Sequence, residues 1–259
     1  MADSPARSAT RIVSLVPSVT ESLFCLGLGD RIVGITDWCV HPSDRVSGLP
    51  RVGGTKDPSV RRILELEPDL VIANREENRK RTVVALRAAG VDVWVSDPRT
   101  VQDAVVLLYE LAELGATAEA IESVVRPVEE TVRAAEEQRP ARGLPVFCPI
   151  WKKPWMAVGG DTYASSLLEL CGGANVFADR GDRRYPLVEI EQIVAAAPEV
   201  ILLPSEPYDF GPRDVLELAA LTLPAARNGR IHLIDGTLVA WYGPRIEPAI
   251  ATIRTLFFD

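Results

Sequence analysis

The chain has 259 residues, of which 47% are hydrophobic and 25% charged, and its formal net charge at pH 7 is −8. This composition is ordinary for a globular protein of one large domain or two lobes. The acidic balance argues against a nucleic-acid partner, and no apolar run reaches the roughly 18 residues that a membrane span needs. Four cysteines are too few for a disulfide scaffold at this length.

The first half of the chain alternates short apolar runs with helical patterns. The runs that predict strands are 11–15, 32–35, 70–73 and 91–95, and the helices expected between them are 18–28, 58–66 and 78–89. Ser18 is placed to cap the first helix. Strands and helices that alternate at this spacing predict a mainly parallel sheet covered on both faces.

The alternation stops in the middle of the chain, where two helices follow each other. Helices are expected at 101–114 and at 117–138, with a kink at Pro127. A helix over 117–138 would be about 33 Å long at about 1.5 Å per residue. Because this stretch contains no glycine, we expect it to restrict two lobes to limited closure.

The second half of the chain returns to the strand–helix pattern. Strands are expected at 144–150, 200–203 and 230–234, and helices at 162–170, from 212 onward and at 245–257. Asp161 is placed to cap the helix that begins at Thr162.

Two pairs of similar phrases relate the halves to each other. Leu66–Ala73 (LEPDLVIA) matches Ala197–Leu203 (APEVILL), and Leu26–Asp30 (LGLGD) matches Leu170–Ala174 (LCGGA). The pairs predict two similar lobes with a ligand cleft between them, so a small-molecule binder is the first hypothesis. The expected limits are 11–115 for the first lobe, 116–140 for a connecting helix and 141–259 for the second lobe.

Most catalytic signatures are missing from the sequence. No GxSxG elbow, P-loop or GxGxxG pattern after a strand is present. Gly159-Gly160-Asp161 admits two interpretations, a phosphate site at a helix N-terminus or, as we prefer, a glycine turn with a capping aspartate. Cys39 and His41 cannot fill a structural zinc shell, but His41 could supply one axial bond to a chelated metal. A hydrogen-bonded loop histidine is the preferred alternative.

The aromatic residues gather in loops that follow predicted strands. Loops at the carboxyl ends of parallel strands line a binding cleft, so flat rings there suit a large, planar and partly apolar ligand. The alternative is packing between the lobes, which we expect of about half of them. The residues concerned are Trp38, Trp151, Trp155, Tyr185, Tyr208, Trp241 and Tyr242.

Four segments resemble the vitamin B12-binding periplasmic proteins associated with ABC transporters. These are Arg11–Glu21 (RIVSLVPSVTE), Glu67–Ile72 (EPDLVI), Leu168–Phe177 (LELCGGANVF) and Gly243–Ile246 (GPRI). Those proteins belong to the helical-backbone metal receptor superfamily, which also binds haem, iron–siderophore complexes and metal ions. The resemblance extends from Arg11 onward and implies two Rossmann-like α/β lobes with mainly parallel sheets, joined by a single long backbone α-helix, without catalytic activity.

The resemblance also implies a set of ligand contacts. Trp38 falls where the family places an aromatic ring against the corrin, and Asn74 replaces another family aromatic. Further contacts from the second lobe would come from Trp155, Tyr185 and Trp241. With the loop residues above, the expected ligand-binding set is Trp38, His41, Lys56, Asn74, Glu76, Trp151, Trp155, Tyr185, Glu206, Trp241 and Tyr242.

The family docks on its permease through one glutamate in each lobe. The second-lobe position keeps Glu191, whereas the first-lobe position holds Arg61, which would repel a permease arginine. The polar segment Met1–Thr10 is no secretory signal, so we expect a cytoplasmic protein if Met1 is the native start, and a periplasmic or cell-surface one if a signal was removed.

These residues lead to one preferred function and its alternatives. We expect a monomeric, non-enzymatic binding protein for a cobalamin-type corrinoid or another metal tetrapyrrole, which serves an ABC importer and uses no catalytic cofactor. The alternatives are a cytoplasmic carrier or chelate-processing enzyme not coupled to a transporter, and a receptor for a free metal ion.

Overall fold

The computed structural model describes residues 9–179 and 183–258. The chain divides into two compact units. Unit 1 comprises the chain up to Asp97 together with Val105–Val128 and Tyr242–Pro244, and unit 2 comprises Pro98–Ala104, Glu129–Trp241 and the chain from Arg245 onward. Each unit contains a four-stranded parallel sheet, so the predicted α/β fold with two mainly parallel sheets is confirmed. The expected domain limits of 11–115, 116–140 and 141–259 stay a prediction.

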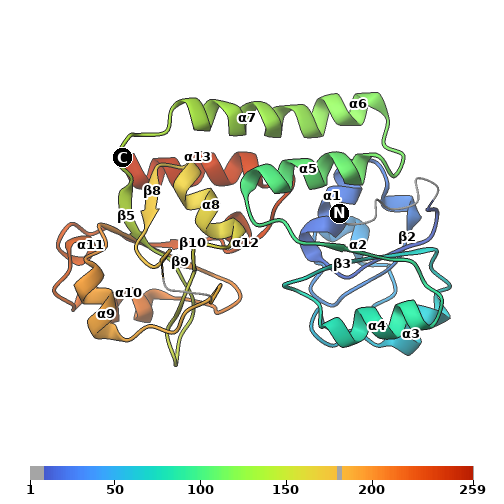
Figure 1. The fold of residues 1–259 in the computed structure, drawn as a ribbon, viewed down its shortest axis with the longest axis horizontal. Coiled ribbons are helices and arrows are strands. Elements are labelled where there is room, and N and C mark those ends of the chain that lie inside the picture. The colour runs from blue at the N-terminus through green and yellow to red at the C-terminus, as the bar shows by residue number, and fades with distance from the viewer. Residues whose placement is uncertain (1–8, 180–182, 259) are drawn as a thin grey trace. The chain divides into compact units, whose positions relative to one another are not determined.

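Unit 1 is built around a sheet with the strand order β2-β1-β3-β4. Figure 1 shows α3 and α4 together on one side of this sheet and α1 on the other. The elements of this part of the chain are β1 (Ile12–Ser14), α1 (Pro17–Cys25), η1 (Gly29–Arg31), β2 (Ile32–Ile35), α2 (Ser43–Val46), α3 (Val60–Glu65), β3 (Leu70–Asn74), α4 (Lys80–Ala88) and β4 (Val93–Ser96).

Burial explains why these apolar runs form strands. All five residues of β3 are buried, as expected for a central strand of a parallel sheet covered on both faces.

The prediction that Ser18 caps the first helix is wrong, because α1 already begins at Pro17 and Val16 is its N-cap. Proline is favoured in the first helical turn, since its missing N–H would have no partner there.

The helices between the two sheets follow the sequence prediction closely. They are α5 (Val101–Ala112), α6 (Ala118–Ala120), a π-helical segment η2 (Ile121–Val125) and α7 (Arg126–Glu137). The helical path is therefore continuous from Ala118 to Glu137 and runs through Pro127. Proline lacks an N–H and crowds the carbonyl of the residue four positions before it, which here is Ser123 in η2. The π turn accommodates this conflict without breaking the helix.

Unit 2 contains a sheet with the order β10-β9-β5-β8 and a short antiparallel pair, β6-β7. In Figure 1, α9, α10 and α11 lie on one side of the larger sheet, and α8 and α13 on the other. Its elements are β5 (Leu144–Phe147), β6 (Pro149–Trp151), β7 (Met156–Ala157), α8 (Tyr163–Leu170), β8 (Gly173–Asn175), α9 (Ile190–Ala196), β9 (Val200–Pro204), α10 (Pro212–Ala219), α11 (Pro224–Arg227), β10 (Ile231–Ile234), α12 (Thr237–Ala240) and α13 (Ile246–Phe258).

Two expectations for unit 2 are wrong. The run 144–150 is not one strand, because the chain leaves the parallel sheet after Phe147 and starts the β6-β7 hairpin at Pro149. Asp161 does not cap α8, since the Thr162 hydroxyl accepts the N–H of Ser165 at 3.1 Å instead.

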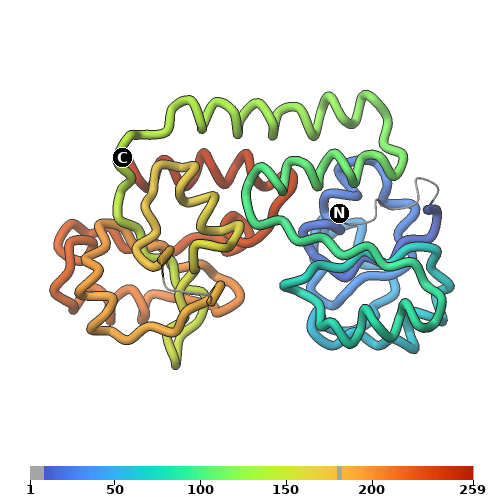
Figure 2. The backbone as a smooth tube through the Cα atoms, viewed as in Figure 1, coloured from blue at the N-terminus to red at the C-terminus, as the bar shows by residue number. Residues whose placement is uncertain are grey.

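The internal repeat predicted from the sequence is present in the strand order of the two units, whose backbone path is traced in Figure 2. Written as β2-β1-β3-β4 and β8-β5-β9-β10, the two sheets have the same strand order. The residue before each repeated proline has a positive φ, 46° at Glu67 and 48° at Ala197. Two residues later, the N–H of Asp69 donates to Arg11 O at 3.0 Å and that of Glu199 to Pro145 O at 2.8 Å. The repeated phrases therefore mark the same turn into the third strand of each unit.

Candidate functional site

In unit 1, polar residues and one exposed indole follow the carboxyl ends of the parallel strands. Trp38 follows β2 and is 65% exposed, Asn74 ends β3, and Ser96 ends β4. The sheet order β2-β1-β3-β4 places its switch point between β1 and β3, and in open α/β sheets ligands bind outside the carboxyl ends at such points. This edge of the sheet is therefore the part of unit 1 suited to a ligand.

The buried side chain of Asn74 organises this edge. Its Nδ2 donates to the Tyr242 hydroxyl at 3.1 Å and to Ser96 Oγ at 3.3 Å. Its Oδ1 accepts the N–H groups of Glu76 at 2.7 Å and Glu77 at 3.2 Å. Asn74 therefore uses both ends of its amide inside the protein and positions the start of the loop after β3.

Tyr242 reaches the same edge from a distant part of the chain. Its phenol also bonds the side chains of Ser18 and Ser96, and burial raises the pKa of the Tyr242 hydroxyl. Gly243 follows with φ 93° and lies directly against Ser22, so a side chain at this position would clash. This glycine lets residues 242–244 pack on unit 1 and presents the phenol to Asn74.

Charged residues lie beside this hydrogen-bond network. Lys56 Nζ donates to the carbonyl of Glu76. The half-buried Glu77 side chain bonds the Thr55 side chain, and burial raises the pKa of its carboxyl group, with the Glu76 charge adding to the shift and the Lys56 charge opposing it. Two carboxylates and one ammonium thus meet at the carboxyl edge of unit 1.

Cys39 and His41 lie in the loop after β2. The Cys39 thiol is buried within 3.1 Å of the hydroxyl groups of Thr20 and Thr36, and burial raises its pKa. His41 is partly buried and precedes Pro42 through a cis peptide bond. Across residues 9–179 and 183–258, no three His, Cys, Asp or Glu side chains are grouped to hold a metal ion. An axial role for His41 stays a prediction.

The predicted aromatic residues of the β6-β7 hairpin lie in two different environments. Trp155 is only 7% exposed and stacks on Phe210 with ring centroids 5.8 Å apart and an interplanar angle of 14°. Trp151 is half-exposed and meets Tyr208 edge to face at 5.6 Å. Tyr208 in turn lies 4.6 Å from Phe210, so one aromatic cluster runs from the core of unit 2 to its surface.

A buried lysine anchors this hairpin. Lys152 Nζ lies 2.6 Å from both Asp214 Oδ1 and Glu217 Oε2 on α10, and 5.2 Å from the centre of the Trp155 ring. Burial alone would favour the uncharged lysine, but the bonds and charges of the two carboxylates outweigh it and raise the pKa of Lys152. Burial likewise opposes ionisation of Asp214, but the Lys152 and Gly211 hydrogen bonds prevail and lower its pKa.

The remaining predicted residues of unit 2 are Trp241 and Glu206, which contact each other, and Tyr185. Trp241 is buried, donates from Nε1 to Glu206 Oε1 at 2.6 Å, and lies under the Arg245 guanidinium at 4.9 Å. Tyr185 is partly buried in the segment before α9. Ligand contacts of Trp155, Tyr185, Glu206 and Trp241 stay predictions.

The phosphate interpretation of Gly159-Gly160-Asp161 is wrong. The N–H of Gly159 donates to Arg184 O at 2.8 Å and that of Gly160 to Ala178 O at 3.2 Å, so neither amide is available for an anion. The Asp161 carboxylate accepts from Arg99 Nη1 at 3.1 and 3.2 Å. This turn is a structural connection within unit 2.

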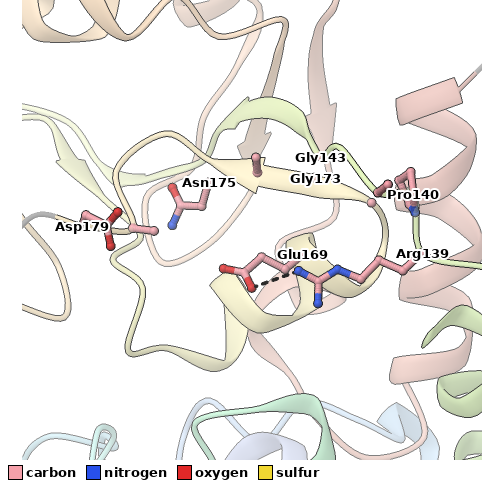
Figure 3. Close-up of a pocket in the computed structure, with 11 residues that line it drawn as sticks. Arg139, Pro140, Gly143, Glu169, Gly173, Asn175 and Asp179 are labelled. Carbon is pink, nitrogen blue, oxygen red and sulfur yellow. Dashed lines mark ion pairs between the residues drawn. The ribbon is translucent and has the colours of Figure 1, made fainter. Parts of the chain in front are cut away.

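Unit 2 also contains a cavity of about 490 Å³ near the start of β5 and the edge strand β8 (Figure 3). The ion pair between Arg139 and Glu169, at 3.6 Å, lies on its wall, and Gly143 and Gly173 form part of its lining. None of the predicted site residues lines this cavity. Asn175 also lines the cavity, and its Nδ2 donates to Val158 O at 2.9 Å and to Ser165 Oγ at 3.0 Å.

The two predicted docking residues lie on exposed helix starts. Arg61 is in the first turn of α3 and pairs with Glu65 at 3.5 Å. Glu191 is in the first turn of α9 and is exposed. Within the described ranges, no helix is both long enough and apolar enough to cross a membrane.

Some of these features were not predicted from the sequence. The bonds of Ser18 and Ser96 with Tyr242, and the ion pairs of Lys152 with Asp214 and Glu217, were missed. Ser96 had a detectable signal, because a serine that ends a parallel strand lies at the ligand-binding edge of the sheet. The Lys152 partners had none, since they lie 62 and 65 residues further along the chain.

The sequence pattern of the periplasmic binding protein family matches residues 12–238, which are most of the chain. The chain belongs to the periplasmic binding protein family. This establishes the family expected from the four sequence segments, and the two parallel sheets described above are those of its structurally known members.

Individual members of the periplasmic binding protein family are similar over most of their length. A vitamin B12-binding protein of Yersinia pestis (strain Pestoides F) is 32% identical over 201 residues, which are 77% of this chain and 71% of that protein. The vitamin B12-binding protein BtuF of Vibrio cholerae has a TM-score of 0.82 at 26% identity and covers 96% of both chains. The heme-binding protein RhuT of Roseiflexus sp. RS-1 also has a TM-score of 0.82 at 26% identity, with 97% of this chain and 99% of that one covered. The relatives thus include binding proteins for two different metal chelates.

Proposed function

We propose that this protein binds a metal tetrapyrrole, and in the first place a cobalamin-type corrinoid. The observation that carries the proposal is the 32% identity to a vitamin B12-binding protein over 77% of this chain. The exposed Trp38 indole at the carboxyl edge of unit 1 supports it, because a flat apolar surface suits a planar macrocycle.

The proposed mode of action is capture and release without bond making. The relatives are binding proteins by name, and unit 1 presents its polar side chains as a hydrogen-bonded network centred on Asn74. Trp38 would contact the face of the macrocycle, while Lys56 and the loop after β3 would contact its polar periphery. We infer a ligand and no catalytic cofactor.

Calorimetric titration with cyanocobalamin tests this proposal. We expect saturable one-site binding by the purified protein. Trp38→Ala should lose at least tenfold in affinity, because loss of an aromatic contact at the centre of a binding site costs about 2 kcal/mol. Leu216→Ala is the matched control, since Leu216 is 71% exposed on α10 and lies outside the predicted site. Absence of saturation up to about millimolar ligand removes the corrinoid.

We further propose that the protein delivers its ligand to an ABC permease, with Glu191 on one contact surface. A carrier that is not coupled to a transporter is the second candidate, and Arg61 favours it because the resemblance places a glutamate there. ATP hydrolysis by a reconstituted permease and ATPase from the same organism, measured with and without the loaded protein, decides between delivery to a transporter and an uncoupled carrier. Stimulation of ATP hydrolysis by the loaded protein, weakened in Glu191→Arg, supports delivery, whereas absence of any stimulation favours the uncoupled carrier.

A further inference from the structure

Fold similarity alone does not separate the two chelates that the relatives bind. A B12-binding and a heme-binding protein match the chain with the same TM-score of 0.82 and the same identity of 26%. The two ligand classes differ in chemistry, since haem carries ionised propionates at its periphery and the corrin ring of cobalamin carries mainly neutral amides. The charges next to the candidate site can therefore discriminate between them.

The carboxyl edge of unit 1 has an excess of negative charge. Glu76 and Glu77 follow β3, and Lys56 is the cation whose charge acts on Glu77 there. The Lys56 ammonium already donates to the carbonyl of Glu76, and its charge offsets one of the two carboxylates. The neighbouring Arg75 is paired with Asp97 at 3.4 Å.

Glu77 is the better placed of the two carboxylates to act on a ligand. Both side chains are half-buried and both charges act on the Tyr242 phenol, but Glu77 acts on it more strongly, and Glu77 also bonds the buried Thr55. A partly desolvated charge acts more strongly on its surroundings than an exposed one, because less water screens it. The N–H of Glu77 donates to Asn74 Oδ1, which fixes the backbone that carries this charge.

In the described part of unit 2, the best-buried cation of the aromatic cluster is already paired, while Lys153 at the tip of the hairpin is exposed to solvent, which screens its charge. Lys152 is held between Asp214 and Glu217 at 2.6 Å each, so this group of three carries a net negative charge. Arg245 is engaged by the Trp241 ring at 4.9 Å and by Thr237 Oγ1 at 2.6 Å.

We propose that Glu77 is a specificity-determining residue that disfavours chelates with ionised carboxylates and thereby favours amide-bearing corrinoids. This inference rests on the proposed function. Like charges that approach each other in a partly desolvated site repel, whereas an amide N–H can donate to the same carboxylate. The selected ligand class is a metal macrocycle whose periphery carries neutral hydrogen-bond donors.

Two corrins with the same ring isolate this charge effect. Dicyanocobinamide carries amides around the ring, and dicyanocobyrinic acid carries carboxylates at the same positions. Both are titrated at pH 8, well above the range in which carboxyl groups normally ionise. We expect the wild-type protein to bind the amide at least about tenfold more tightly, and Glu77→Gln to reduce this ratio by about tenfold.

Two further variants make the test decisive. Lys56→Gln should shift the ratio in the opposite direction, because it removes the cation beside Glu77, and it tests the proposal even if Glu77→Gln fails to fold. Glu119→Gln, on the exposed start of α6, is the matched control and should leave the ratio as in the wild type.

The outcomes separate this inference from the proposed function. A wild-type protein that binds both corrins equally, or an unchanged ratio in both Glu77→Gln and Lys56→Gln, overturns the role of Glu77 and leaves chelate binding intact. A wild-type protein that binds neither corrin overturns the proposed function, and the selectivity with it.

Discussion

The side-chain amide of Asn74 donates to the phenol of Tyr242 at 3.1 Å, across 168 residues of sequence. Both groups are buried, and Asn74 also receives the N–H groups of Glu76 and Glu77. One amide therefore joins the end of β3, the loop that follows it and the segment before α13. This arrangement holds the carboxyl edge of unit 1 in one conformation.

Replacement of Asn74 by alanine should destabilise the protein by about 3 kcal/mol, because it leaves two N–H groups without their acceptor and removes the Tyr242 contact. Tyr242→Phe removes the hydrogen bonds of the phenol with Asn74, Ser18 and Ser96 and should cost about 2 kcal/mol. Urea unfolding followed by circular dichroism measures both values. Asn228→Ala, at an exposed position after α11, is the control and should change the free energy of unfolding by less than about 0.5 kcal/mol. Equal effects of Asn74→Ala and Asn228→Ala would contradict the organising role of Asn74.

Replacement of Lys152 by methionine should cost about 3 kcal/mol of stability, since it leaves the largely buried Asp214 carboxylate without its cation. The Asp214 pKa is lowered in the folded protein, so the advantage of the wild type over Lys152→Met should be present above about pH 4 and shrink as the pH falls further. Urea unfolding at pH 7 and at pH 3 checks the size and the sign.

Lys153→Met is the matched control for this prediction. Lys153 is the next residue of the same hairpin but is exposed, so its replacement should have an effect below about 0.5 kcal/mol. A similar loss in both variants would show that the hairpin tolerates no change at all, rather than that the buried ion pair stabilises it.

The sequence predicted the elements whose pattern is local and missed those that depend on distant contacts. The apolar run that forms β3 and the glycine-free stretch that forms α6, η2 and α7 were found because periodicity and composition mark them. The strand β8 was missed, since three residues that include Gly173 and Asn175 carry no strand pattern.

The candidate site shows the same limit. The sequence pattern correctly predicted Trp38 after the second strand, and it predicted Asn74 just after the third strand, of which Asn74 is in fact the last residue, because strand ends can be read from the pattern to within about one residue. It could not distinguish the exposed Trp38 from the buried Trp155, whose environment is created by Phe210, 55 positions further along the chain. Burial of a loop aromatic is decided by tertiary packing, which a local pattern does not contain.

Glu77 gives a stability prediction that requires no ligand. Because its pKa is raised in the folded protein, its favourable contribution is complete below the ordinary value of 4.5 and is lost as the pH rises through the raised value. Glu77→Gln removes this pH-dependent contribution. The free energy of unfolding of the variant, relative to that of the wild type, should therefore increase between pH 4 and pH 8. Urea unfolding over this range measures the difference, and Glu119→Gln should show no such trend. A constant difference between Glu77→Gln and the wild type would exclude a desolvated carboxylate.

The repeated turn before β3 and β9 offers two neighbouring alanines with opposite expectations. Ala197 has φ 48° and ψ 53°, a left-handed conformation in which glycine is not strained, so Ala197→Gly should stabilise the protein by about 0.5 kcal/mol. Ala195 is an exposed residue within α9, where glycine costs about 1 kcal/mol. Thermal and urea unfolding of the two variants compares them directly. Destabilisation by Ala197→Gly as large as that by Ala195→Gly would mean that the αL turn is not the conformation this repeat encodes.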